Sequence, residues 1–155
     1  MTGTNDGTTF SPAMNLTRGM MAQILYNLEQ GKPAASAGFT DVASGAWYAD
    51  AVNWAAANGI VSGYGSGKFG PEDPITREQM AVLLYNYARY KGDDVTATTD
   101  LAAFSDSEQV SDWAEYAMQW AVAEGLIQGS NNSLNPLGTA SRAEVAQVLM
   151  NYFNK

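Results

Sequence analysis

Apolar residues recur at helical spacing in three segments of the chain, each preceded by a threonine or serine. The three stripes are Met21, Ile24, Leu25 and Leu28; Met80, Leu83, Leu84, Tyr87 and Ala88; and Val145, Val148, Leu149 and Tyr152. Apolar positions three and four residues apart form one face of an α-helix. A hydroxyl side chain just before the first turn accepts a hydrogen bond from an amide that would otherwise lack a partner. The pattern therefore predicts three helices that begin directly after Thr17, Thr76 and Ser141.

The surroundings of these helix starts repeat. The matching segments are Phe10-Ser11-Pro12 with Leu16-Thr17-Arg18, Phe69-Gly70-Pro71 with Ile75-Thr76-Arg77, and Leu134-Asn135-Pro136 with Ala140-Ser141-Arg142. The three arginines lie 59 and 65 positions apart, a period that suits a unit of two helices and a loop. The chain is therefore predicted to contain copies of one helix–loop–helix unit.

A second, alanine-rich helix is predicted twice, over 47–58 and 113–124, and the first copy lacks it. Trp54 and Trp120 lie in the middle of these helices and are expected in the core. The chain thus reads as a single domain, 1–155, with two and a half copies: a half repeat with its linker over 1–38, a second repeat over 39–103 and a third over 104–155. The expected fold is all-α, with at most short extended segments near Phe39, Phe69 and Phe104.

Composition narrows the possible chemistry. The chain contains no cysteine and no histidine, which excludes thiolate nucleophiles, imidazole bases and the commonest zinc ligands. Asp41 and Asp106 are expected to accept hydrogen bonds from local backbone. The run Asn5-Asp6-Gly7 lacks the later ligands of a calcium loop. We therefore expect no metal and no cofactor.

Charge and hydropathy bear on partners. The net charge is −8, which disfavours nucleic acid and anionic membrane surfaces. No apolar stretch is long enough for membrane insertion, and the first residues do not resemble a signal peptide, so a signal for export is expected outside this chain.

The repeats resemble a known family. Phe39-Thr40-Asp41-Val42, Trp47-Tyr48, Gly59-Ile60-Val61-Ser62-Gly63-Tyr64-Gly65 and the segment from Phe69 to Gln79 are similar to a surface-layer homology (SLH) repeat. The resemblance implies a pseudo-threefold helical domain that is not an enzyme. It also implies binding of secondary cell-wall polysaccharide, often carrying pyruvylated N-acetylmannosamine, and an extracellular location in the cell wall or S-layer of a Gram-positive-type bacterium.

The resemblance also suggests which residues contact the ligand. A pyruvate ketal is an anion that a guanidinium can grip with two hydrogen bonds, assisted by amides at a helix N-terminus. The predicted ligand-binding residues are Arg77, Arg142, Arg18, Thr76, Trp47, Tyr64 and Trp113, the aromatic ones as faces for sugar rings. The alternative for each arginine is structural: its stem packs over the loop and its guanidinium pairs with a nearby carboxylate. The resemblance favours ligand contact for at least one arginine.

The half repeat departs from the family pattern. Without its first helix, the stripe of Met21, Ile24 and Leu25 is expected to expose apolar surface. Truncation, a helix donated by a second chain in a homo-oligomer, or cover from another part of the parent protein would each account for it. Arg18 is thus the least secure of the arginines. The third copy also departs, with Ser141 for threonine and Leu134 for phenylalanine, which leaves a purely structural groove as an alternative for this copy.

Two alternatives to carbohydrate binding remain open from the sequence. One is an assembly module completed by a neighbour's helix. The other is glycoside hydrolysis by paired carboxylates. The visible acids, Glu78, Glu144 and Asp41, already have capping or turn roles, which disfavours catalysis.

Overall fold

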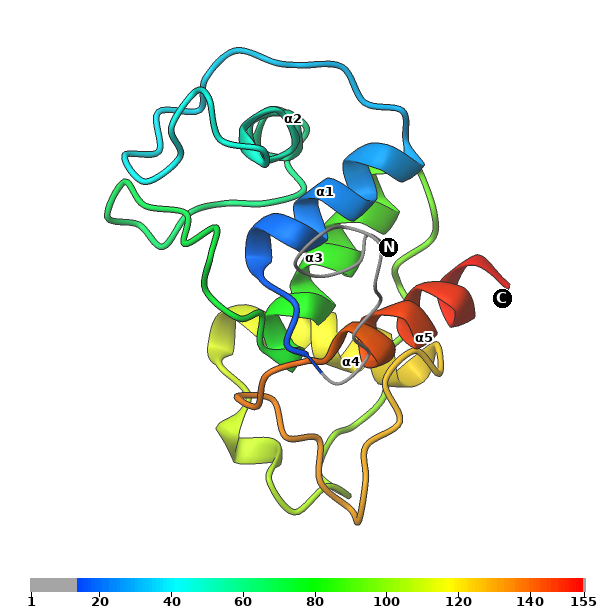
Figure 1. Cartoon of the computed structure of the whole chain (residues 1–155). Coiled ribbons are helices and arrows are strands. Elements are labelled where there is room, and N and C mark those ends of the chain that lie inside the picture. Colours follow the sequence, from blue (N-terminus) through cyan, green and yellow to red (C-terminus); the bar gives the residue numbers. More distant parts are fainter. Residues whose placement is uncertain (1–13, 155) are drawn as a thin grey trace. The chain divides into compact units, whose positions relative to one another are not determined.

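The computed structural model describes residues 14–154. Three helices begin directly after Thr17, Thr76 and Ser141 as predicted, whereas the two alanine-rich helices begin at Ala49 and Glu115, two residues later than predicted. The elements are α1 Arg18–Leu28, α2 Ala49–Ala57, α3 Arg77–Tyr90, the short 3-10 helices η1 Ser107–Gln109 and η2 Asp112–Ala114, α4 Glu115–Ala123 and α5 Arg142–Phe153 (Figure 1). The described residues form no strand and only isolated β-bridges. The all-α prediction is confirmed. The run Asn5-Asp6-Gly7, considered above as a calcium loop, lies outside the described residues.

The predicted caps fix the starts of α1, α3 and α5. The hydroxyl of Thr17 accepts from the Met20 amide at 3.1 Å. Thr76 with Gln79, and Ser141 with Glu144, form complete capping boxes. These bonds satisfy amides that have no partner inside the helix, which explains why a short local motif predicts the helix start correctly.

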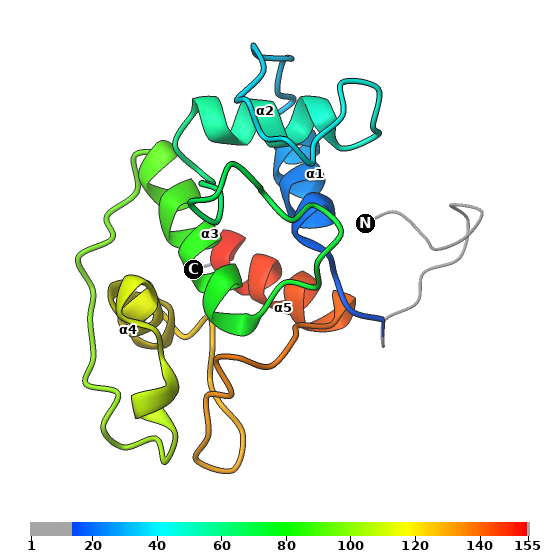
Figure 2. The same ribbon diagram turned by 90° about the vertical axis from the view of Figure 1, so that its left-hand side faces the viewer.

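The chain divides into two compact units, and Leu16–Ile75 is the first. In this unit α2 crosses α1 and packs against it (Figure 2). Met21 and Leu25 are completely buried and Trp54 is 5% exposed, with its ring 5.6 Å from that of Tyr26. The prediction that the α1 stripe is exposed is therefore wrong for these two residues. These two residues are buried because α1, the second helix of the first copy, packs against α2, the first helix of the second copy.

The second unit holds α3, α4 and α5 with residues 14–15. Here α4 packs on α3, which repeats the pairing of a second helix with the next copy's first helix. Trp120 is completely buried, and its ring lies 5.7 Å from Tyr85 and 6.5 Å from Tyr152 of α5. The prediction that Trp54 and Trp120 are core residues is confirmed.

One aspartate closes the loop of each complete copy, Asp41 in the second and Asp106 in the third. The Asp41 carboxylate accepts from the amides of Phe69 and Gly70 at 2.9 and 2.8 Å. Asp106 accepts in the same way from Leu134 and Asn135 at 2.8 and 2.7 Å. The aspartates do bind backbone, but their partners lie 28 and 29 residues away, so the prediction of a local turn was wrong about distance.

These bonds also affect the acidity of both aspartates. Burial acts to raise the pKa of each carboxyl, but hydrogen bonds from the two loop amides and from the aspartate's own amide, with Lys68 also acting on Asp41, together outweigh it. The pKa values of Asp41 and Asp106 therefore lie below the usual aspartate value, because the amides stabilise the ionised form.

Candidate functional site

At the helix starts, backbone amides donate hydrogen bonds to carbonyls of another copy of the repeat. In the first unit the amides of Arg18 and Gly19 donate to the carbonyls of Asp73 and Pro71 at 2.9 and 2.8 Å. Because those two carbonyls follow the helix start by more than fifty residues, the second copy's loop supplies them. The start of α1 is therefore completed by the following copy.

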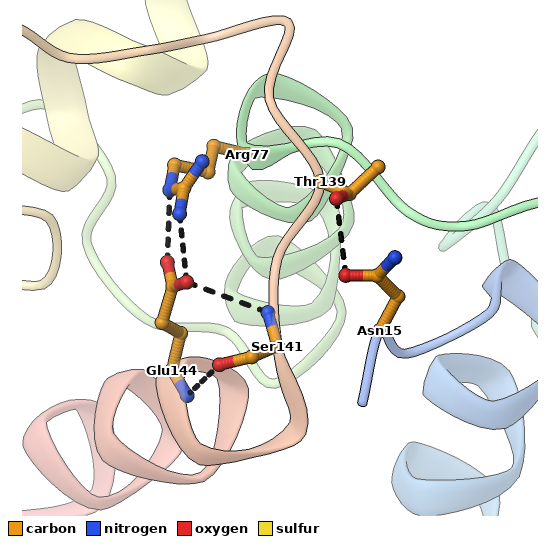
Figure 3. A network of polar contacts seen from close by, with 5 residues as sticks. All are labelled: Asn15, Arg77, Thr139, Ser141 and Glu144. Atoms are coloured by element: carbon orange, nitrogen blue, oxygen red, sulfur yellow. Dashed lines mark hydrogen bonds and ion pairs between the residues drawn. The ribbon is translucent and has the colours of Figure 1, made fainter. Parts of the chain in front are cut away.

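The second unit repeats this exchange. The amides of Arg77 and Glu78 donate to Gly138 and Pro136 of the third copy, and the amide of Arg142 donates to Met14 of the first copy at 2.9 Å. The hydroxyl of Thr139 also donates to the Asn15 side chain, as Figure 3 shows. At the starts of α1, α3 and α5, the first amides of the helix therefore donate to carbonyls of another copy.

This exchange removes one predicted element of the site. At the start of α3, the amides of Arg77 and Glu78 are held by backbone carbonyls, and that of Gln79 by the Thr76 hydroxyl. The expectation that these helix-terminal amides assist in holding an anion is wrong for α3. At the start of α3, an anion would therefore have to be bound by side chains.

The Arg18 guanidinium is built into the loop of the second copy. Its Nε donates to the Phe69 carbonyl at 2.9 Å and its Nη2 to the Ser62 carbonyl at 3.3 Å. Its central carbon lies 4.7 Å from the ring centre of Tyr64 and 4.6 Å from that of Phe69. Arg18 is only 6% exposed, so the structural alternative describes this arginine.

Electrostatics fit this role. Burial lowers the pKa of Arg18, while Tyr64 and the carboxylates of Asp73 and Asp41 act in the opposite direction. Tyr64 donates to Asp73 at 2.8 Å and lies over Gly70, where a Cβ would come within 2.5 Å of its ring. Arg18, Tyr64 and Asp73 therefore fill the space within the second copy's loop.

Arg77 behaves differently although it occupies the same repeat position. Its Nε donates to Glu144 Oε2 at 2.8 Å and its Nη2 to Oε1 at 2.7 Å, a bidentate ion pair (Figure 3). The side chains of Arg77 and Glu144 are 20% and 40% exposed. Arg77 is thus accessible, and its guanidinium already holds a carboxylate in planar geometry.

Arg77 and Glu144 lie at a groove of about 1070 Å³ in the third copy. Its lining combines apolar side chains with hydroxyl and amide groups: Met80, Leu126, Ile127, Leu134 and Val148 on one hand, and Ser105, Gln109, Gln128, Ser130, Ser133, Asn131, Asn135, Gln147 and Asn151 on the other. Arg77 is the one basic residue among the described residues that line this groove. The two acids of the lining are already engaged, Glu144 by Arg77 and Asp106 by the amides of Leu134 and Asn135. A single cation among hydroxyl and amide groups suits a ligand with many hydroxyls and one negative charge.

Two substitutions between copies explain why this groove is open. Ser130 stands where the second copy has Tyr64, and Gly138 stands where it has Asp73. A Cβ on Gly138 would come within 2.6 Å of Arg77 Nη1, so glycine leaves the room that this guanidinium occupies. Sequence analysis missed Glu144, Ser130 and Gly138 as site residues, although aligning the copies position by position displays all three differences.

The remaining predicted residues are not brought together at this groove. Arg142 is 3% exposed and the Thr76 hydroxyl holds the Gln79 amide. Trp47 and Trp113 are 59% and 62% exposed, and neither lines the groove. Tyr64, at 47% exposure, belongs to the filled loop of the second copy.

Ionisable groups among the described residues do not gather into a metal site, since no three acidic side chains converge there. Glu78 is 2% exposed and accepts from the amide and hydroxyl of Ser111 at 2.9 and 2.6 Å. The acids considered for catalysis, Glu78, Glu144 and Asp41, are thus each engaged in holding the fold or in the pair with Arg77.

Comparison with known proteins agrees with the repeat architecture. The family model of the S-layer homology domain matches residues 38–81 and 103–146, which together make up more than half of the chain. An amylopullulanase of Thermoanaerobacterium thermosulfurigenes is 36% identical over 154 residues, covering 96% of this chain but 8% of the relative. The surface-layer 125 kDa protein of Lysinibacillus sphaericus is 32% identical, covering 90% of the chain and 12% of the relative.

A third relative is named for anchoring. The cellulosome-anchoring protein of Acetivibrio thermocellus is 30% identical over 145 residues, covering 89% of the chain and 32% of the relative. In each case the chain spans only a minor part of the relative's length. Two matched repeats, with helix starts and loops that obey one rule, lead to one conclusion: the chain belongs to the S-layer homology family.

Proposed function

We propose that the chain is a non-catalytic anchoring module that holds a larger protein at the cell surface by binding an anionic cell-wall polysaccharide. The observation that carries this proposal is the open groove of the third copy, where the accessible Arg77 guanidinium holds a carboxylate with two hydrogen bonds. The ligand's carboxylate takes the same two donors. Its sugar rings lie along the hydroxyl and amide groups of the lining.

The chemistry of the groove favours a pyruvylated sugar over a polyanion. The chain carries a net charge of −8, so a densely charged ligand is repelled at long range. A pyruvate ketal bears one carboxylate on a neutral sugar. This matches a groove with one arginine, where the Glu144 carboxylate already occupies the donors and the remaining polar groups are mostly amides and hydroxyls. The favoured ligand is a secondary cell-wall polysaccharide with pyruvylated N-acetylmannosamine.

The relatives support an anchoring role and not catalysis. An amylopullulanase and a surface-layer protein differ in what their names say they do, yet both contain a segment like this chain. A segment common to both is best explained by a task they have in common, such as placement at the surface. We therefore place the chain outside the cell, in the wall or S-layer of a Gram-positive-type bacterium.

Two other partners are less well supported. Among residues 14–154, no helix has the length and apolar character needed to span a bilayer. Completion of the half repeat by a second chain rested on an exposed α1 stripe, and Met21 and Leu25 are buried. Molecular mass that rises with protein concentration on a sizing column would revive assembly as a function.

The test is a titration with pyruvylated cell-wall polysaccharide and with the same polymer after pyruvate removal. Arg77→Ala should weaken binding to the pyruvylated polymer at least about tenfold, because a bidentate charged contact is lost, and should leave the weak binding to the stripped polymer unchanged. Arg89→Ala is the matched control, since it removes a charge from the exposed end of the same helix, outside the groove lining. Equal binding to both polymers, or equal losses in both variants, would refute the proposal.

A further inference from the structure

Glu144 accepts hydrogen bonds from two of the guanidinium nitrogens of Arg77. Both of its oxygens are engaged, at 2.8 Å to Nε and 2.7 Å to Nη2. A ligand carboxylate that approaches the same edge of the guanidinium meets this pair first. Two carboxylates cannot share those two donors, so one has to leave.

Helix capping does not explain why this position carries an acid. The reciprocal bond of the capping box, from the Ser141 amide to Glu144 Oε1, is 3.5 Å long, whereas the same oxygen lies 2.7 Å from Arg77. In α3 the neutral Gln79 closes the equivalent box at 3.0 Å. A glutamine therefore caps at least as well, and the negative charge of Glu144 is directed at Arg77.

The acid also coincides with the open groove. The positions equivalent to Glu144 hold Met20 in α1 and Gln79 in α3, so an acid occurs at this place only in the third copy. In the second copy's loop, the guanidinium of Arg18 donates to carbonyls and lies over two rings, and the carboxylates that act on it, Asp73 and Asp41, do not come from the helix-capping position. The carboxylate accompanies the one arginine that remains accessible in an open groove among the described residues.

We propose that Glu144 is a specificity-determining residue, an internal carboxylate that occupies the Arg77 site and must be displaced by the ligand's own. This inference rests on the proposed function and specifies how that same site discriminates. Displacement weakens every ligand that uses these donors by the same factor, so a small anion held by its charge alone binds about two- to fivefold more weakly than it would to a free Arg77. Only a ligand whose sugar rings make further contacts in the groove overcomes the competition. Glu144 is 40% exposed, so its carboxylate is rehydrated readily when it leaves.

Glu144→Gln tests this directly, because it removes the charge and installs the residue that caps α3. We expect binding of the pyruvylated polymer to tighten about two- to fivefold, the range of a partly exposed ion pair. We also expect the inhibition constant of inorganic phosphate to be lower by about the same factor in Glu144→Gln than in the wild-type protein. In the double variant with Arg77→Ala, the gain should disappear.

Glu115→Gln is the matched control, since Glu115 is exposed at the start of α4 and its replacement changes the net charge equally. If Glu144→Gln binds no tighter than Glu115→Gln, or gains equally with Arg77→Ala present, the inference is overturned while the anchoring proposal stands. If none of the folded variants binds, or Arg77→Ala binds like wild type, the proposed function fails and this inference with it.

Discussion

Arg18 and Arg77 occupy the same position in their repeats, yet replacing each with alanine should have very different effects on stability. Arg18→Ala leaves the carbonyls of Phe69 and Ser62 without their donor inside the loop. It also removes a cation that lies 4.6 to 4.7 Å from two ring centres. Arg77→Ala breaks one pair whose partner, Glu144, is 40% exposed.

The expected magnitudes follow from these contacts. Leaving a buried carbonyl unsatisfied costs about 1–3 kcal/mol, and a desolvated cation–π contact contributes roughly 0.5–2 kcal/mol. Since the bond to Ser62 is long, we expect Arg18→Ala to lower the free energy of unfolding by on the order of 3–5 kcal/mol. For Arg77→Ala, a partly exposed ion pair predicts a loss of about 0.2–1 kcal/mol.

Urea unfolding followed by tryptophan fluorescence measures both losses, and a shifted midpoint with an unchanged slope indicates a stability effect alone. Arg18→Lys keeps the charge but not the planar fork of donors, so its stability should fall between those of wild type and Arg18→Ala. Equal losses for Arg18→Ala and Arg77→Ala would refute the division into a structural and an accessible arginine. A large loss for Arg77→Ala would also disqualify it as a clean binding variant.

Two further predictions concern the loops. The pKa values of Asp41 and Asp106 are depressed in the folded protein, so the stability that they contribute is present above the unfolded pKa of about 3.9 and is lost as the pH falls through the lower folded pKa values. In urea unfolding, the free energy of unfolding should therefore fall less between pH 7 and pH 3 in the variant carrying both Asp→Asn changes than in the wild-type protein. An equal fall in both proteins would count against this prediction. Gly129 and Gly125 both have a φ of +75°, but only at Gly129 would a Cβ approach Phe104 to 2.8 Å. Gly125→Ala should cost about 1–2 kcal/mol for the left-handed backbone, and Gly129→Ala clearly more in the same assay; equal costs would show that the close approach does not matter.

The helix starts could be predicted from sequence because their cause is local. Thr17, Thr76 and Ser141 each lie next to the amides that they cap, so a pattern of four residues contains the whole interaction. The pairing of α1 with α2 could not be predicted in this way. The sequence repeat groups a first helix with the second helix that follows it, whereas packing joins a second helix to the next copy's first helix.

The site was only partly predictable for a related reason. Arg18 and Arg77 occupy the same position of the sequence repeat, and what separates them is the occupant of a loop more than forty residues away, Tyr64 in one copy and Ser130 in the other. Ligand contact by Arg77 remains a prediction, and the pairing of Arg77 with Glu144 depends on a contact across 67 residues. Neither composition nor periodicity encodes such a contact.

The exchange of carbonyls at the helix starts has a consequence for how such modules change during evolution. In solenoid proteins each repeat contacts only its neighbours in sequence, so a repeat can be gained or lost with modest effect. Here the amide of Arg142 in the last copy is completed by Met14 in the first, just as Arg77 is completed by Gly138. Deleting one copy would leave polar groups of the others unpaired, so these repeats are expected to be inherited and recombined as a set.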